Sequence, residues 1–219
     1  MAPLPARKTL PPDPAAARDA VIQRTATLAQ VKKAACACRA CELWARATQT
    51  VFGRGPAPAP VMLVGEQPGD KEDRLGEPFV GPAGRILDES LVAAGLDRDT
   101  VYVTNVVKHF SWEERGKWRI HKKPKPHQIQ ACRPWLEAEI AAVQPEVIVC
   151  LGATAAQALL GRAFRVTQQR GQFIPSPLAP KVVATVHPSS LLRAPDEETR
   201  AREKKRFIED LKKVARAVR

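Results

Sequence analysis

The sequence predicts a three-layer α/β domain in which helices cover both sides of a mainly parallel β-sheet. Three observations support this prediction. Short apolar runs rich in β-branched residues recur along the chain, helical patterns lie between them, and polar segments directly follow three of the runs. Strands that alternate with helices form parallel sheets, because a parallel connection has to cross over the sheet.

Four apolar runs are expected to form the central strands. Residues 61–65 (VMLVG) are apolar throughout, which is typical of a strand buried on both faces. The others are residues 101–107, 146–151 and 181–186. Ligands bind at the carboxyl ends of parallel strands. We therefore expect three polar segments to converge on one edge of the sheet: residues 66–70, Asn105 onward, and residues 187–190.

Five helices are expected around these strands. The clearest begins at Pro82, which suits the first turn of a helix, and stops at Gly95. Another covers residues 153–160 and is closed by Gly161. The remaining helical patterns cover residues 21–35, 128–143 and 197–218. We expect residues 21–219 to form one domain, and the Pro- and Ala-rich residues 1–20 to form a flexible arm.

Residues 108–126 show no apolar period and contain most of the local positive charge, so they predict a long exposed loop. Loops of this length are usually functional or disordered. His109 in this segment and His127 just beyond it match no motif. We expect both histidines at the surface.

The composition and charge limit the classes of function. With 44% hydrophobic and 26% charged residues, the chain is globular rather than disordered. The net charge of +12 suits a polyanionic partner such as a nucleic acid, although a basic protein need not bind one. A basic block, residues 117–125, suits phosphate contacts, whereas residues 200–205 suit a solvated helix face. No apolar run could cross a membrane and no signal sequence is evident, so we expect a cytoplasmic protein. We also expect a monomer.

The five cysteines are Cys36, Cys38, Cys41, Cys132 and Cys150. An odd number in a cytoplasmic protein argues against disulfides and leaves metal ligation or ordinary buried thiols. Cys38 and Cys41 have the spacing of a chelating pair, and Cys132 and Cys150 are expected at one end of the fold. Four thiolates suit zinc and an iron–sulfur cluster equally well. Cys132 and Cys150 as plain core thiols, and Cys36 in place of Cys38, remain alternatives.

Two strings resemble the active-site motifs of a known family. Residues 65–70 (GEQPGD) followed by 76–84 (GEPFVGPAG) resemble the first motif of the uracil-DNA glycosylase superfamily, and residues 187–190 (HPSS) resemble its second. The cysteine pattern is similar to that of its iron–sulfur branches. The resemblance extends from about Cys38 to about Arg193. It implies a glycosylase-like fold, single- or double-stranded DNA containing uracil as the substrate, and a 4Fe-4S cluster held by Cys38, Cys41, Cys132 and Cys150.

A further string, residues 117–121 (KWRIH), resembles the inserted histidine loop of the class X branch of that superfamily. In that branch the histidine becomes covalently joined to the abasic sugar, which implies that role for His121. Gln67 also fits, because the ordinary iron–sulfur branches often have Ala there. Trp118 departs from the branch, which favours Lys-Arg-Arg, and this leaves the detailed loop contacts open.

The chemistry of base excision suits these residues. An enzyme that acts on a base must extrude it from the stack. Phe79 is expected to stack on the extruded ring and the Asn105 amide to read its edge. Bond cleavage makes the sugar positive and the departing uracil negative. Glu66 is expected to stabilise the sugar, and His187 to donate a hydrogen bond to the uracil oxygen.

The resemblance implies further contacts with the DNA substrate. An apolar wedge beside an arginine, residues 191–193 (LLR), suits the space left by the extruded base. The side chains expected to contact substrate are Gln67, Asp70, Arg119, Ser189 and Ser190.

Three functions therefore remain open. The first is a single-turnover glycosylase that links itself to DNA through His121. The second is a recycling iron–sulfur glycosylase in which His121 is only a DNA contact. The third is a non-catalytic DNA-binding metalloprotein. Glu66, Asn105 and His187 argue against the third, and His121 in a basic loop argues for the first.

Overall fold

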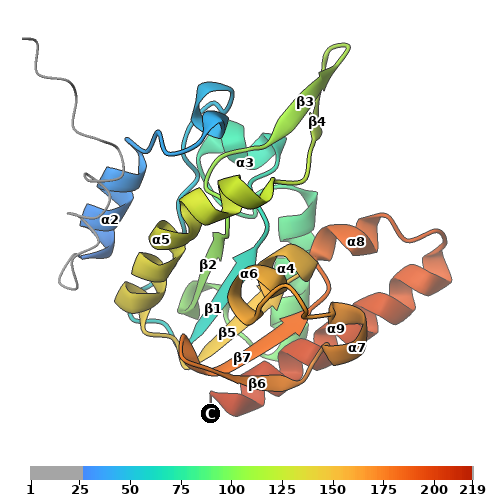
Figure 1. The fold of residues 1–219 in the computed structure, drawn as a ribbon. Coiled ribbons are helices and arrows are strands. Elements are labelled where there is room, and N and C mark those ends of the chain that lie inside the picture. The colour runs from blue at the N-terminus through green and yellow to red at the C-terminus, as the bar shows by residue number, and fades with distance from the viewer. Residues whose placement is uncertain (1–26, 219) are drawn as a thin grey trace, which may run out of the picture.

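The computed structural model describes residues 27–218, which form a twisted sheet between two layers of helices (Figure 1). The strand order is β2-β1-β5-β7-β6. Four neighbouring strands run parallel, and β6 pairs antiparallel with β7 at the edge. The predicted fold class is confirmed. The strands are β1 (Val61–Gly65), β2 (Val101–Asn105), β5 (Val147–Leu151), β6 (Phe173–Ser176) and β7 (Ala179–Thr185).

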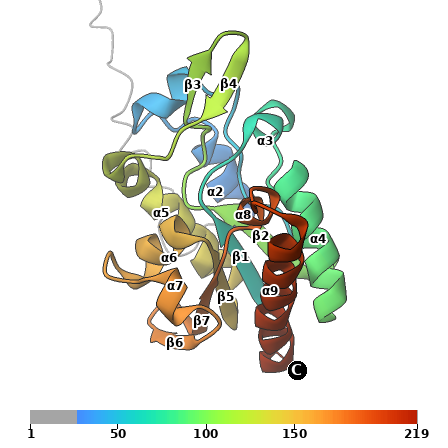
Figure 2. The ribbon, with the colours of Figure 1, turned by 90° about the vertical axis from the view of Figure 1, so that its right-hand side faces the viewer.

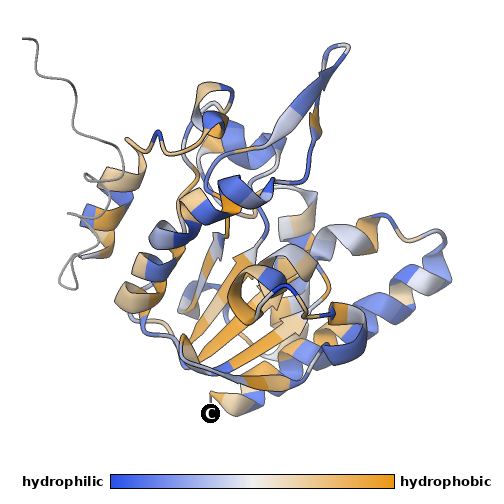
Figure 3. Ribbon diagram, in the orientation of Figure 1, coloured by the Kyte–Doolittle hydropathy of each residue, from blue (hydrophilic) through white to orange (hydrophobic). Residues whose placement is uncertain are grey.

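Both faces of the central strands are buried, and alternate residues face different layers. Val61 and Leu63 of β1 belong to one cluster of buried side chains, whereas Met62 and Val64 belong to the other. This alternation follows from the two-residue period of a strand and explains why the predicted strands are apolar throughout. Figure 3 shows the hydrophobic strands enclosed between helices whose outer faces are hydrophilic.

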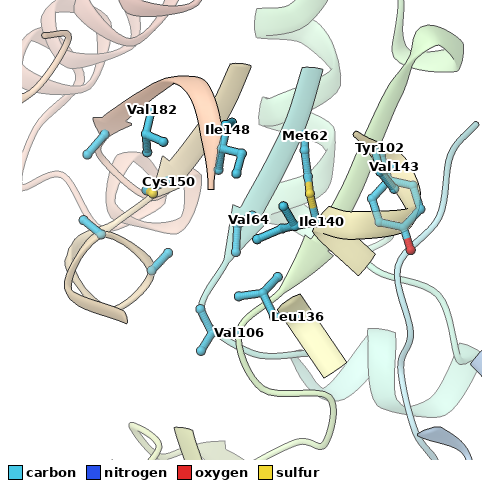
Figure 4. Close-up of a cluster of buried hydrophobic side chains, with 14 of the residues drawn as sticks. Met62, Val64, Tyr102, Val106, Leu136, Ile140, Val143, Ile148, Cys150 and Val182 are labelled. Atoms are coloured by element: carbon cyan, nitrogen blue, oxygen red, sulfur yellow. The ribbon is translucent and has the colours of Figure 1, made fainter. Parts of the chain in front are cut away.

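Each cluster joins the sheet to its own helices. The cluster with Val61 includes residues of α4 and α9, which lie side by side on one face. The cluster with Met62, drawn in Figure 4, packs against Leu136 and Ile140 of α5 and against α6. These long helices confirm the predicted pattern: α4 (Pro82–Ala94), α5 (Pro126–Val143), α6 (Ala153–Leu160) and α9 (Glu197–Ala217).

The N-terminal helix is α2 (Leu28–Ala35), whose first turn is capped by Thr27 and Gln30. Its predicted start at residue 21 and the predicted arm, residues 1–20, lie outside the described residues. The shorter helices are α3 (Asp70–Leu75), α7 (Val166–Gln169), α8 (Pro188–Leu192) and the 3-10 helices η1 (Glu42–Ala45) and η2 (Arg98–Thr100).

The prediction of one long exposed loop over residues 108–126 is wrong. Residues 108–111 are buried, and a β-hairpin follows, formed by β3 (Trp112–Arg115) and β4 (Trp118–His121). The hairpin turns at Gly116, whose φ of 58° is the left-handed conformation that a two-residue turn requires. The strands are short and charged, so they lack the apolar alternation by which strands are recognised.

The prediction that His109 lies at the surface is also wrong. Its side chain is buried, and its Nε2 lies 3.0 Å from Thr50 Oγ1. Burial, opposed by Asp73 and reinforced by Arg39, lowers the pKa of His109 to about 4. His127 is exposed and pairs with Glu42, as predicted for a surface residue.

No helix among residues 27–218 is long and apolar enough to span a membrane.

Candidate active site

Three predicted catalytic or binding residues meet at the carboxyl edge of the sheet. Glu66 follows β1, Asn105 ends β2, and His187 follows β7. The hairpin rises beside this edge (Figure 2) and brings His121 Nε2 to 3.5 Å from Glu66 Oε1. The rings of Phe79 and His187 are 5.9 Å apart. The expected convergence of the polar segments is therefore confirmed.

Asn105 and Phe79 line a narrow space next to Gly65. A Cβ atom at Gly65 would lie 2.3 Å from Asn105 Oδ1 and 2.6 Å from Phe79 Cζ, so only glycine leaves both side chains in place. Phe79 has a φ of 57°, a strained conformation for a bulky residue. Asn105 Oδ1 is buried and has no hydrogen-bond partner within residues 27–218. An acceptor of this kind is suited to a donor on a ligand.

Glu66 is held between a helix and the hairpin. Its Oε2 accepts a short hydrogen bond from Thr154, at the start of α6, and its Oε1 faces His121. Burial lowers the pKa of His121, an effect that Glu66 opposes and Arg193 reinforces. The His121 ring is therefore neutral near pH 7, as a nitrogen nucleophile must be.

His187 has a defined tautomer. The backbone N–H of Ser189 donates to its Nδ1 at 3.1 Å, so that nitrogen carries no proton. Burial, with Arg193 and His121, lowers the pKa of His187 to about 4. The ring is thus neutral with its proton on Nε2, which leaves one N–H to donate.

Gln67 clamps the base of the hairpin through backbone atoms. Its Oε1 accepts from Ser111 N at 3.0 Å, and its Nε2 donates to the carbonyls of Ser111 and Lys122, both at 3.1 Å. Lys122 directly follows His121. Gln67 is predicted to bind substrate, but within the described residues its amide is used to fix the hairpin.

Arg119 ties the hairpin to α3 through two carboxylates. Its guanidinium bonds Asp70, and its Nη1 donates to Asp73 Oδ2 at 2.7 Å. Asp73 is fully buried and also accepts from the backbone N–H of Thr48 at 3.0 Å. Asp70 and Arg119 were expected to contact DNA, and here they bond to each other.

Of the two leucines in the wedge expected at residues 191–193, only one is exposed and could enter DNA. Leu191 is 2% exposed and packs in the core, so its assignment to the wedge is wrong. Leu192 is 42% exposed. The Ser190 hydroxyl donates to the His187 carbonyl, which stabilises the turn into α8.

A buried ion pair lies beneath Asn105. Lys108 Nζ bonds Glu139 of α5 and donates to the Asn105 carbonyl at 2.6 Å. Glu139 also accepts from the hydroxyls of Tyr102 and Thr104, each at 2.9 Å. Lys108 and Glu139 are each 1% exposed or less at the side chain. The ion pair therefore fixes the backbone carbonyl of Asn105 and with it the position of the Asn105 side chain.

Sequence reasoning did not single out four residues that support the site: Thr154, Asp73, Lys108 and Glu139. A signal was available for Lys108, because it directly follows the apolar run of residues 101–107. A lysine at such a place is either at the surface or paired in the interior. Only the helix that passes behind it, which carries Glu139, distinguishes the two cases.

Three of the four predicted cluster ligands lie together. Burial raises the pKa of the Cys132 thiol to about 12, and the nearby thiols of Cys41 and Cys38 add to this rise. Trp135 Nε1 donates to Cys38 Sγ at 3.2 Å. Burial alone raises the pKa of Cys150 to about 12, without a contribution from another thiol. Cys36 is exposed.

No group of three or more His, Cys, Asp or Glu within residues 27–218 is arranged to hold a single metal ion. The donor set nevertheless suits an iron–sulfur cluster, which spreads its ligands around a cage larger than one ion and takes cysteine thiolates by preference. The thiols of Cys38, Cys41 and Cys132 provide three such ligands.

The protein is an α/β protein whose polar residues Glu66, Asn105 and His187 lie at the carboxyl ends of parallel strands, where such proteins bind their ligands. A family model described as "Uracil DNA glycosylase superfamily" matches residues 52–212. The chain belongs to this superfamily.

Curated relatives agree over most of the chain. The chain is 38% identical to a type-4 uracil-DNA glycosylase of Thermotoga maritima over 178 residues, which cover 81% of this chain and 87% of that protein. It is 36% identical to a type-4 uracil-DNA glycosylase of Archaeoglobus fulgidus over 172 residues, which cover 72% and 79%. A type-4 enzyme of Sulfurisphaera tokodaii is 34% identical over 196 residues, which cover 86% and 83%.

Proposed function

We propose that this protein excises uracil from DNA and then joins the abasic sugar through His121. The main support for excision is the state of Asn105 Oδ1. This atom is buried without a hydrogen-bond partner in the described structure and lies beside Phe79. Leaving a buried acceptor unpaired costs about 1–3 kcal/mol. A base that donates to this oxygen recovers that free energy on binding.

Uracil has the edge that matches this amide. Its N3–H donates to Asn105 Oδ1, and its O4 accepts from Asn105 Nδ2. Cytosine presents an acceptor at N3 and a donor at the exocyclic amine, so both contacts would be mismatched. The extruded ring would stack on Phe79. The relatives named type-4 uracil-DNA glycosylases support this choice of base.

Two side chains face the charges that develop on cleavage. Glu66, held by Thr154, is placed to stabilise the positive sugar. His187 Nε2–H is free to donate to uracil O2, because Nδ1 accepts from Ser189. Since both groups are fixed by protein contacts before the reaction, they need little reorganisation during it.

His121 is the proposed nucleophile. The lone pair of its neutral ring forms a bond to C1′ while the bond from C1′ to uracil N1 breaks, and the electron pair of that bond leaves with uracil. The alkylated ring releases its other proton, and uracil takes up one proton, so charge balances. Support comes from the 3.5 Å approach of His121 to Glu66 and from the clamp that Gln67 and Arg119 apply to the hairpin.

We further propose that the protein holds a 4Fe-4S cluster with Cys38, Cys41 and Cys132 among its ligands. When bound, the cluster would tie α2 and the segment after it to α5. Excision transfers no electron, so the cluster would need no redox role. The DNA phosphates would meet the exposed basic residues around the hairpin: Lys117, Lys123 and Lys125.

The experiment that tests this proposal follows adduct and free uracil in one tube. The protein is mixed with a uracil-containing oligonucleotide, and half of the sample is run on a denaturing gel while free uracil is assayed in the other half. A denaturant-resistant band is expected. Free uracil without that band would favour a recycling enzyme. If neither the band nor free uracil appeared, the protein would be a DNA-binding protein without glycosylase activity.

His121→Ser is expected to lose the denaturant-resistant band. Glu66 and His187 remain in place, so uracil release is expected to continue with water as the nucleophile. The matched control is His127→Ser, which removes an exposed histidine paired with Glu42 outside the site. An adduct that persists in His121→Ser, or that maps to a peptide without His121, would contradict the assignment.

Asn105→Asp is expected to slow uracil excision by roughly 10- to 100-fold, because it replaces the donor to uracil O4 with a charged acceptor, a loss of about 1–3 kcal/mol. Single-turnover kinetics on a uracil oligonucleotide measure this effect. Gln168→Glu makes the same change of amide to acid on an exposed residue of α7 and is the control. Unchanged excision by Asn105→Asp would remove this side chain from the base site.

A further inference from the structure

We infer that Trp118 and Ile120 form a platform on the outer face of the hairpin, on which an unstacked nucleobase beside the extruded uracil packs. This inference rests on the proposed function, because that function takes the DNA strand past His121. It concerns two exposed apolar side chains that neither the excision chemistry nor the core uses. Four observations support it: the face that they share, their exposure, the charges around them and their distance from His121.

The pairing of β3 with β4 determines which side chains share a face of the hairpin. Trp118 is paired with Arg115, and Ile120 with Glu113. Side chains alternate along a strand, so these four residues lie on one face and His121 lies on the other. The face of His121 is turned toward the active site. The face of Trp118 is therefore the outer face.

Both apolar side chains of this face are exposed. Trp118 is 65% exposed and Ile120 is 39% exposed, and no other aromatic side chain within residues 27–218 is as exposed as Trp118. The tip of the hairpin projects beyond the rest of the domain in both views (Figure 1, Figure 2). Neighbouring exposed apolar groups of this size are typical of a surface that a partner covers.

The charges around the platform suit a nucleic acid as this partner. Lys117 Nζ lies 5.6 Å from the centre of the Trp118 ring, and Arg115 is exposed on the paired strand. The acidic residue of this face, Glu113, already forms an ion pair with Lys122. Proteins that bind single strands combine cations, which meet the phosphates, with an aromatic ring on which a base stacks. A base is therefore the expected partner of the Trp118 ring.

The platform is within reach of the nucleotide that His121 is proposed to attack. Trp118 precedes His121 by three residues on β4, which corresponds to about 10 Å along a strand. A stacked DNA strand advances by about 3.4 Å per nucleotide. The base that packs on Trp118 is therefore expected within about three nucleotides of the uracil, where the strand crosses the edge of β4.

This position also predicts which form of DNA benefits from the platform. A base can stack on Trp118 only after it has left its own stack and its own partner. In single-stranded DNA no base pair has to break, whereas a duplex would lose a second base pair in addition to that of the uracil. The platform therefore favours binding to single-stranded DNA.

The test measures binding of the full-length protein to single-stranded oligonucleotides that contain one 2′-deoxypseudouridine. The uracil of this nucleotide is joined to the sugar by a carbon–carbon bond, so binding is measured without excision. Each of the three nucleotides on either side is replaced in turn by an abasic analogue. For the wild type, loss of one of these bases is expected to weaken binding by about 5- to 150-fold, the strength of one stacked base.

Variants of Trp118 assign this base to the platform. Trp118→Ala is expected to bind the intact oligonucleotide more weakly by the same factor and to lose nothing further when that base is removed. Trp118→Phe keeps a ring and is expected to retain most of the affinity. Trp118→Arg exchanges the ring for a charge, so its binding is expected to depend more steeply on salt and not on the base. The control is Phe173→Ala, which removes another exposed ring, on β6, and is expected to leave binding unchanged.

A complementary strand adds a second comparison. Pairing the oligonucleotide is expected to weaken binding by the wild type more than binding by Trp118→Ala. The inference is overturned if base removal weakens the wild type and Trp118→Ala equally, or if the wild type is indifferent to every neighbouring base. Uracil release and adduct formation on ordinary uracil DNA are measured separately. Their failure, with base-dependent binding intact, would refute the proposed function and leave the platform in place.

Discussion

Glu66→Gln is expected to slow cleavage of the glycosidic bond by about 10²–10³-fold, the usual effect of removing one fixed group that stabilises charge in the transition state. The amide keeps the shape of the carboxylate and a bond to Thr154, but it loses the negative charge that is proposed to stabilise the sugar. Covalent adduct and free uracil are therefore expected to fall together, since cleavage precedes both.

The comparison that isolates this effect is between Glu66→Gln and two other variants. Glu137→Gln removes the same charge on the exposed face of α5 and is expected to leave the rate unchanged. Thr154→Val keeps the carboxylate but removes its donor, so an intermediate loss is expected. If Glu66→Gln reduced the adduct but not free uracil, Glu66 would act on capture by His121 and not on cleavage.

Lys108→Met is expected to lower the free energy of unfolding by about 3–5 kcal/mol, because it leaves Glu139 as an unpaired charge in the interior. Glu139 is fully buried, and its remaining donors are neutral hydroxyls and one backbone N–H. Unfolding in urea measures the change. Binding of uracil DNA is expected to weaken as well, since Lys108 supports the Asn105 carbonyl.

A double-mutant cycle separates the pair from its surroundings. Lys108→Met with Glu139→Leu is expected to be less destabilising than the sum of the single variants, because the second change removes the stranded charge. The exposed pair Arg133–Glu137 on the same helix is the control, and breaking it is expected to change stability by about 1 kcal/mol or less. Additive effects at Lys108 and Glu139 would contradict a coupled pair.

The elements that sequence predicted correctly are those with a strong local signal. Residues 61–65 have the apolar run that is typical of a buried strand, and Pro82 and Gly95 mark both ends of α4. The convergence of Glu66, Asn105 and His187 followed from the parallel sheet alone. Each of these depends on a pattern that is complete within a few residues.

The failures share a different cause. His109 and Lys108 belong to a charged stretch that looks solvated, and only contacts with Thr50 and Glu139, far away in sequence, make their burial favourable. Gln67 was expected to face substrate because its motif does, but its amide bonds the backbone of a hairpin 44 residues away. Roles set by distant partners cannot be read from a local pattern.

Because Gln67 fixes only the base of the hairpin, the length of the hairpin and the position of His121 can change independently. It contacts only backbone atoms at the base, and His121 pairs with Trp112 at that same end, whereas Gly116 and Trp118 lie toward the tip. Residues could thus be inserted at the tip, two in each strand to keep the same faces, without displacing His121. Each such insertion would extend the hairpin by about 7 Å. The length of the hairpin could therefore change at its tip while the position of the His121 ring stays constant.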